Sequence, residues 1–145
     1  MNDNAPQEQD EQPHGELTTR TMAMPADTNA SGDIFGGWVV SQMDIAAGIC
    51  AGECARLRVV TIAIDSMTFI RPVQVGDVMC VYTKVLKVGK TSMQIHVEAW
   101  ALRHRYGHRE KVTSAKFIFV AVDDEGHPCE IPAEQKEKYN IEPSC

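Results

Sequence analysis

No apolar run in this 145-residue sequence reaches the ~18–20 positions that a membrane-spanning helix requires, so no membrane span is expected. The first 16 residues have neither a basic start nor an apolar stretch, so no secretory signal is expected. The five cysteines are an odd number without paired spacing, which favours reduced thiols and a cytoplasmic location. Hydrophobic residues make up 43% of the chain, enough for the core of one domain.

Several motifs of common enzyme classes are also absent. There is no G-x-S-x-G and no serine with a clear histidine partner, so a serine-hydrolase triad is not expected. Without a P-loop or a G-x-G-x-x-G after a strand, nucleotide hydrolysis and dinucleotide binding are not supported. Aromatic residues, at 6%, are too scattered for an RNA-binding sheet, so no nucleic-acid partner is expected. Cys50 and Cys54 lack a second ligand pair, so we expect buried thiols and no metal site.

The net charge of −6 is distributed unevenly along the chain. Residues 1–16 contain five acidic residues and no Lys or Arg, and residues 123–145 contain seven acidic residues and two lysines. Residues 17–122 therefore carry a net positive charge. The acidic ends are explained most simply by solubility, and the alternative is that the middle of the chain favours an anionic ligand.

The pattern of residues predicts one α+β domain. An apolar helix is expected over residues 37–55, and because it is apolar on nearly every face we expect it to be buried on every side. Alternating, β-branched runs predict strands over residues 17–24, 59–69, 78–88, 90–102 and 111–122, with tight turns at 87–90 and 105–108. A curved antiparallel sheet wrapped around one long central helix follows from these elements.

Asp44 lies inside the predicted helix, between Met43 and Ile45. A carboxylate with apolar neighbours on every helix face is costly to desolvate unless it has partners. It is therefore either a structural group that accepts hydrogen bonds from a nearby loop, or an ionised general base or nucleophile that a cleft reaches.

The loop before the helix ends in Gly36 and Gly37. Backbone N–H groups at a helix N-terminus, assisted by the helix dipole, can polarise a carbonyl or hold an oxyanion. An ordinary glycine-rich connection would have the same sequence. Asn29 and Asp33 are equally consistent with an Asx-turn and a helix cap.

The run MPADTNASGDIFGGW at residues 24–38, followed by Met43-Asp44, resembles the signature of the hotdog-fold acyl-CoA thioesterases. The likeness is greatest to the bacterial YciA type, which is similar to the vertebrate cytosolic acyl-CoA hydrolases. Further matches are SMTFIRP at 66–72, VGDV at 75–78, KVGKTS at 87–92 and residues 117–123. The resemblance covers residues 17–132, with a disordered acidic tail expected at 1–16 and a second acidic tail at 133–145.

This resemblance implies a hotdog fold, paired into a homodimer with a continuous sheet and assembled further into a hexamer, a trimer of dimers. Active sites would lie at the dimer interface, where Asp44 of one subunit and Asn29 of the other form the catalytic pair. Backbone N–H groups near Gly36 and Gly37 would hold the thioester oxygen. The implied activity is hydrolysis of acyl-CoA to CoA and a carboxylic acid, with Asp44 as general base or nucleophile.

The resemblance also implies where coenzyme A lies. Its arm would run along residues 60–66 and its phosphates would meet the basic residues, in agreement with the positive middle of the chain. The implied CoA-binding residues are Thr61, Ser66, Arg71, Lys87, Gly89, Lys90, Thr91 and Ser92.

No cofactor is expected besides CoA as part of the substrate and product, because a thioester is already activated. Two alternatives remain. The first is another hotdog acyl-CoA enzyme such as a hydratase, although all five histidines lie outside the predicted helix. The second is a non-catalytic acyl-CoA-binding sensor.

Overall fold

The structure, a computed structural model, describes residues 12–103 and 107–140 of the chain. These residues form five strands, two α-helices and one 3₁₀ helix. In chain order the elements are β1 (Glu16–Met22), η2 (Pro25–Asp27), α1 (Gly36–Ala55), β2 (Arg58–Ile64), β3 (Val78–Val88), β4 (Ser92–Arg103), β5 (His108–Val122) and α2 (Ala133–Tyr139).

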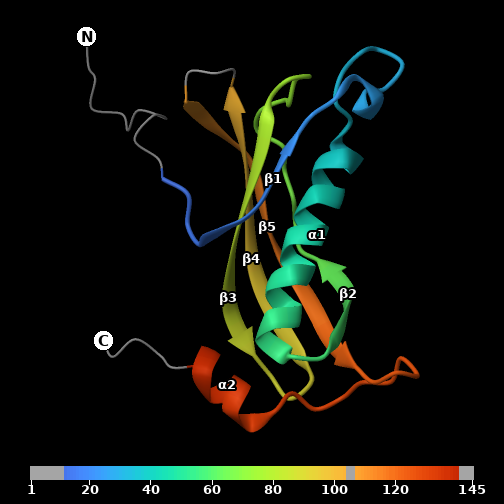
Figure 1. Cartoon of the computed structure of the whole chain (residues 1–145), viewed down its shortest axis with the longest axis vertical. Coiled ribbons are helices and arrows are strands. Elements are labelled where there is room, and N and C mark those ends of the chain that lie inside the picture. The colour runs from blue at the N-terminus through green and yellow to red at the C-terminus, as the bar shows by residue number, and fades with distance from the viewer. Residues whose placement is uncertain (1–11, 104–106, 141–145) are drawn as a thin grey trace.

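The five strands make one antiparallel sheet in the order β1-β3-β4-β5-β2, and α1 lies along one of its faces (Figure 1). Buried and half-buried residues alternate over the first half of β4, from Ser92 to Val97, as expected for a strand with one face on the core, whereas residues 97–101 are buried on both faces. Small buried residues of α1, Ala47 and Ala51 among them, let the helix approach the sheet closely. The predicted α+β architecture is confirmed, and no described helix is long and apolar enough to cross a membrane.

The prediction that the long helix is buried on every side is wrong for a single chain. Ile45 and Ile49 are 53% and 44% exposed, because one sheet covers only one side of α1. The edge strand β2 likewise exposes Val60, Ile62 and Ile64. A single chain therefore leaves uncovered both an apolar stripe of α1 and an apolar sheet edge, the pattern typical of a protein interface.

The strand predictions differ most from the structure at β2, which ends at Ile64 and not at residue 69. Beyond Ile64 the chain follows β5 through isolated bonds, such as the one from Ile70 N to Val112 O at 2.9 Å, and not through a regular ladder. The turn predicted at 87–90 is confirmed between β3 and β4. The turn predicted at 105–108 falls partly on residues 104–106, which lie outside the described residues.

Residues 12–16, before the expected domain boundary at residue 17, contact the sheet. Residues 1–11 lie outside the described residues, but His14 contacts Glu98 of β4 through its backbone N at 3.2 Å and its Nδ1 at 3.1 Å. Burial alone would raise the pKa of the Glu98 carboxyl, but hydrogen bonds from His96 and Trp100 hold this pKa at about 2. The carboxylate is therefore ionised at neutral pH and anchors the segment that leads into β1.

The predicted C-terminal tail contains α2, a short helix with no apolar periodicity to reveal it in the sequence. Tertiary contacts hold it in place: the Gln135 side chain donates to the Cys54 carbonyl at 2.8 Å. Just beyond the helix, the Asn140 side chain bonds both the N and the O of Val88, at 3.0 and 2.7 Å. The start of the β3–β4 turn is thereby fixed by residues that were predicted to form a C-terminal tail.

Candidate active site

Asp44 lies near the middle of α1, half-buried at the side of the helix that faces β2. Its Oδ1 accepts a hydrogen bond of 2.6 Å from the hydroxyl of Thr61 on β2. This bond fixes one carboxylate oxygen and leaves Oδ2 available to a water molecule or a substrate. Thr61, which the sequence analysis assigned to CoA, is thus a partner of Asp44. No sequence motif predicts this contact, because it depends on how α1 lies against β2.

Asn29 lies in the loop that leads into α1, and its side chain is exposed. Its Oδ1 accepts hydrogen bonds from the backbone N of Ser31 at 2.9 Å and of Asp33 at 3.1 Å, the geometry of an Asx-turn. Within the described residues, Nδ2 of Asn29 has no acceptor. The loop therefore fixes the side chain through its oxygen and presents its N–H donors outward.

The N-terminus of α1 begins at Gly36 and has no side-chain cap, since the preceding residue is Phe35. The N–H groups of Gly36 and Gly37 are therefore left for an external oxygen, which the partial positive charge of the helix end favours. A cavity of about 390 Å³ adjoins this helix end. Its lining residues are Ile34, Gly36, Val39, Phe69, Ile70, Arg71, Pro72, Val73 and Val112.

Asp44 and the helix N-terminus do not form a site within one chain. Asp44 follows Gly36 by eight residues, which corresponds to about 12 Å along an α-helix. Reacting groups must approach to about 3–3.5 Å, so one thioester cannot contact both from the same subunit. The arrangement is complete only if one of these groups comes from a second chain.

The predicted CoA-binding residues are also divided between two ends of the sheet. Nη1 of Arg71 donates to the carbonyl of Lys111 at 2.7 Å, whereas Ser92 pairs with Val120 at the opposite end of β5. Nine residues of strand separate these two points, a distance of about 30 Å. Ser66, at the surface, lies just beyond the end of β2.

The β3–β4 turn itself is compact. Gly89 N donates to Ser92 O at 2.7 Å, and a Cβ on Gly89 would lie 3.1 Å from the Ser92 hydroxyl. Lys87 and Lys90 are exposed beside it, and the Lys90 carbonyl accepts from Ile131 N at 2.9 Å. The turn thus presents two lysines on a backbone held by the C-terminal segment.

The two cysteines of α1, Cys50 and Cys54, are not suited to nucleophilic chemistry. Cys54 is fully buried, and burial raises the pKa of its thiol to about 11, while burial also raises the pKa of Cys50. Within residues 12–103 and 107–140, no cluster of three or more His, Cys, Asp or Glu side chains could hold a metal ion. Asp44 is therefore a better candidate for the reactive group of α1 than Cys50 or Cys54.

The fold and this site define the chain as a member of the thioesterase superfamily, whose family model matches residues 31–107. Among individual proteins, it is 53% identical over 128 residues to the acyl-CoA thioester hydrolase YciA of Salmonella typhimurium, covering 86% of this chain and 96% of the relative.

Solved structures agree with this assignment. A hexameric broad specificity acyl-coenzyme A thioesterase matches with a TM-score of 0.84 and 50% identity, over 89% of this chain and 91% of that one. A hexameric hotdog fold thioesterase of Campylobacter jejuni matches with a TM-score of 0.81 and 41% identity, over 88% and 98%. The first of these enzymes has also been solved with an aspartate replaced by alanine. The chain has the hotdog fold.

Proposed function

We propose that the protein hydrolyses acyl-CoA thioesters to free CoA and a carboxylic acid. The observation that carries the proposal is Asp44, a carboxylate on the central helix that accepts a hydrogen bond from Thr61 of β2. The chain that contains it is 53% identical to an acyl-CoA thioester hydrolase. The aspartate-to-alanine variant of a structural relative supports a functional aspartate in such enzymes. The four described cysteines are free thiols, which supports the cytoplasm as the compartment of this activity.

In the proposed reaction, Asp44 acts on the thioester carbonyl directly or through water. As general base, it removes a proton from water while the water oxygen forms a bond to the carbonyl carbon; the C–S bond then breaks and the CoA thiolate takes up a proton. As nucleophile, it forms a mixed anhydride that water hydrolyses. In both routes the amides of Gly36 and Gly37 stabilise the negative charge on the carbonyl oxygen. No metal or redox group enters the proposal, because the thioester is already activated.

The minimum active unit in this proposal is a homodimer. Pairing β2 with its copy would cover the exposed sheet edge and continue the sheet, and the uncovered stripe of α1 would pack against its copy. Two-fold symmetry would bring the helix N-terminus and Asn29 of the partner subunit toward Asp44, which supplies the groups that one chain lacks. The hexameric state of the relatives supports a trimer of dimers.

The same pairing accounts for the division of the CoA-binding residues. Antiparallel pairing of β2 places the Arg71 end of one chain beside the β3–β4 turn of its partner, so that Arg71 and the two lysines can face one CoA. Lysines suit phosphates as point charges, whereas Arg71 can engage one bidentately. Thr91, Ser92 and the Gly89 backbone lie within this turn, and Ser66 adjoins the β2 pairing.

Removing the turn lysines should weaken binding of CoA without affecting the chemistry. Lys87→Ala/Lys90→Ala should raise the KM for an acyl-CoA several-fold and leave kcat almost unchanged, because these contacts grip the substrate equally in ground and transition states. The effect should shrink at high salt. Measuring kcat and KM on an acyl-CoA and on the matching acyl-pantetheine provides the test: an equal loss on both substrates, or none on either, would contradict a phosphate site at the turn.

The cavity of about 390 Å³ beside Gly36 is proposed to receive the acyl chain. Its lining is mainly apolar, with Arg71 as the one charged lining residue, and apolar cavities with few polar groups suit aliphatic ligands. The pantetheine arm, which carries amides, would then follow the interface along β2.

A thiol-release assay on acetyl- through palmitoyl-CoA tests the proposed function. We expect CoA release from several chain lengths by the purified chain, with no added metal or redox cofactor. Hydration of an enoyl-CoA without CoA release would favour the hydratase, and binding of acyl-CoA without any turnover would favour the sensor.

A further inference from the structure

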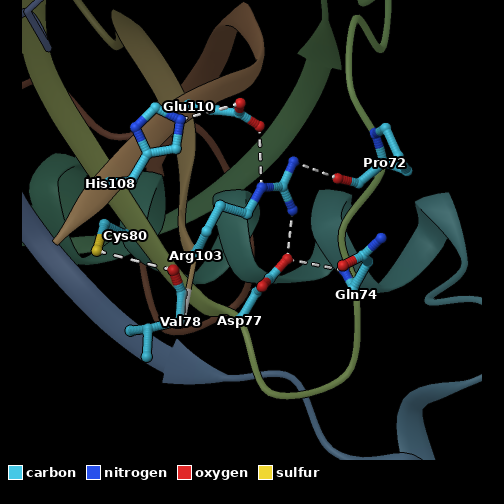
Figure 2. Close-up of polar contacts among 8 residues, drawn as sticks. All are labelled: Pro72, Gln74, Asp77, Val78, Cys80, Arg103, His108 and Glu110. Carbon is cyan, nitrogen blue, oxygen red and sulfur yellow. Dashed lines mark hydrogen bonds and ion pairs between the residues drawn. The ribbon is translucent and has the colours of Figure 1, made fainter. Parts of the chain in front are cut away.

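Arg103, the last residue of β4, forms the centre of a polar cluster at one end of the sheet (Figure 2). Its Nη1 donates to Asp77, its Nη2 to the Pro72 carbonyl at 2.8 Å, and its Nε to Glu110 at 3.0 Å. The side chain is 12% exposed and that of Asp77 is 2% exposed, so the Arg103–Asp77 ion pair is almost dry. One guanidinium on β4 thus joins β5 and the segment between β2 and β3.

Two of these partners hold the guanidinium in a fixed orientation. Glu110 lies on the neighbouring strand β5, and its hydrogen bond from Arg103 lowers the pKa of the Glu110 carboxyl, so this partner is ionised at neutral pH. Asp77 is itself fixed, because its carboxylate also accepts from Gln74 N at 2.9 Å. With both carboxylates in place, the planar guanidinium directs its Nη2 at the Pro72 carbonyl.

The segment that Arg103 holds, residues 65–77, connects β2 to β3 and includes residues 69–73, one wall of the cavity beside Gly36. Its first part is attached to β5, by bonds that include Thr113 Oγ1 to Thr68 O at 2.8 Å and Ile70 N to Val112 O at 2.9 Å. Pro72 has no N–H to continue such a pattern. Arg103 supplies the attachment at the point where this pattern ends.

The wall reaches the reacting end of the site. The ring of Phe69 lies 3.4 Å from the position that a Cβ on Gly36 would occupy, so a shift of the wall changes the space at the first amide of α1. A displaced wall would therefore change the space that is open to the acyl chain beside Gly36.

We propose that Arg103 is a positioning residue for the acyl-binding cavity: by joining Asp77, Glu110 and the Pro72 carbonyl, it fixes the wall formed by residues 69–73 and so sets the affinity for the acyl chain. The proposal rests on the proposed function, in which this cavity takes the acyl group. Arg103 is not among the residues that line the cavity, so it acts through residues 69–73 on the binding of the acyl chain.

Arg103→Lys tests this role, because lysine keeps the positive charge but cannot bond three acceptors in a fixed fork. We expect the KM for decanoyl-CoA to rise about tenfold and the KM for acetyl-CoA to rise much less, with kcat within about threefold of wild type. Lys116→Met is the matched control: it removes the 3.4 Å ion pair between Lys116 and Asp65 on the same segment, away from the cavity lining, and should leave both KM values unchanged.

Glu110→Gln provides a second variant if Arg103→Lys does not fold. It leaves Arg103 and Asp77 in place and loosens the fork, so the KM for decanoyl-CoA should rise in the same direction by a smaller factor. Equal rises for both chain lengths, a fall in kcat alone, or an equal effect of Lys116→Met would overturn the positioning role and leave Arg103 a purely structural residue.

A further experiment separates this proposal from the proposed function. Calorimetry measures the affinity for a non-hydrolysable S-decyl-CoA thioether, and thermal unfolding measures the stability of the same variants. If the wild type binds the thioether but releases no thiol from acyl-CoA, the proposed hydrolysis is wrong, and the affinity ratio between wild type and Arg103→Lys still decides the positioning role. We expect the variant to lose about tenfold in thioether affinity. Unchanged affinity despite a lower unfolding temperature would overturn the proposal.

Discussion

Asp44→Asn is expected to lower kcat for thiol release by about 10²–10⁴-fold, the usual contribution of a general base. Asparagine has the same shape and its Oδ1 can still accept the hydrogen bond from Thr61, so the fold and the α1–β2 contact should persist. What is lost is the ability to take a proton or to attack the carbonyl carbon. Steady-state thiol release on one acyl-CoA, together with thermal unfolding and CoA affinity, measures the effect.

Comparison with a second variant, Thr61→Val, tests whether the carboxylate itself is required. Thr61→Val removes the hydroxyl that orients Asp44 but leaves the carboxylate, so it should cost less activity than Asp44→Asn. If Asp44→Asn instead keeps more than about a tenth of the wild-type kcat, the carboxylate is not the base or nucleophile. Asp44 would then be the structural group that accepts a hydrogen bond from a neighbouring element, the alternative that its sequence position left open.

The central helix and its carboxylate could be predicted from the sequence because both are local features. A 20-residue helix with almost no charge has to be covered, and Asp44 is conspicuous within it. Which surface covers the helix is not a local feature of the sequence. Ile45 and Ile49 read as core residues in the sequence, yet they are exposed in the single chain, because hydrophobicity does not distinguish contact with the same chain from contact with a second copy.

The long-range polar contacts could not be predicted from the sequence for a different reason. Thr61 meets Asp44 across 17 residues, and Arg103 meets Pro72 across 31, through hydrogen bonds that leave no periodic pattern. The lysine-bearing turn and Arg71 were each recognisable as basic, but only strand register shows that they lie at opposite ends of β5. The sequence therefore predicted the types of groups in the site better than their arrangement.

Two inactive variants should restore each other when their subunits are mixed. In the proposed dimer, each site takes Asp44 from one subunit and Asn29 from its partner, so a heterodimer of Asp44→Asn with Asn29→Asp regains one intact site of its two. Random exchange between equal amounts should therefore recover about a quarter of the wild-type sites. Thiol release before and after exchange, with subunit exchange followed by two affinity tags, measures the recovery.

The choice of Asn29→Asp keeps this experiment interpretable. Aspartate retains the Oδ1 that accepts from the backbone of Ser31 and Asp33, so the Asx-turn should survive, while the outward Nδ2 donor is replaced by an oxygen. Mixing each variant with itself is the control and should recover nothing. Heterodimers that form and stay inactive would contradict a site shared by Asp44 of one subunit and Asn29 of the other. Recovery would therefore show that the site is built from two subunits.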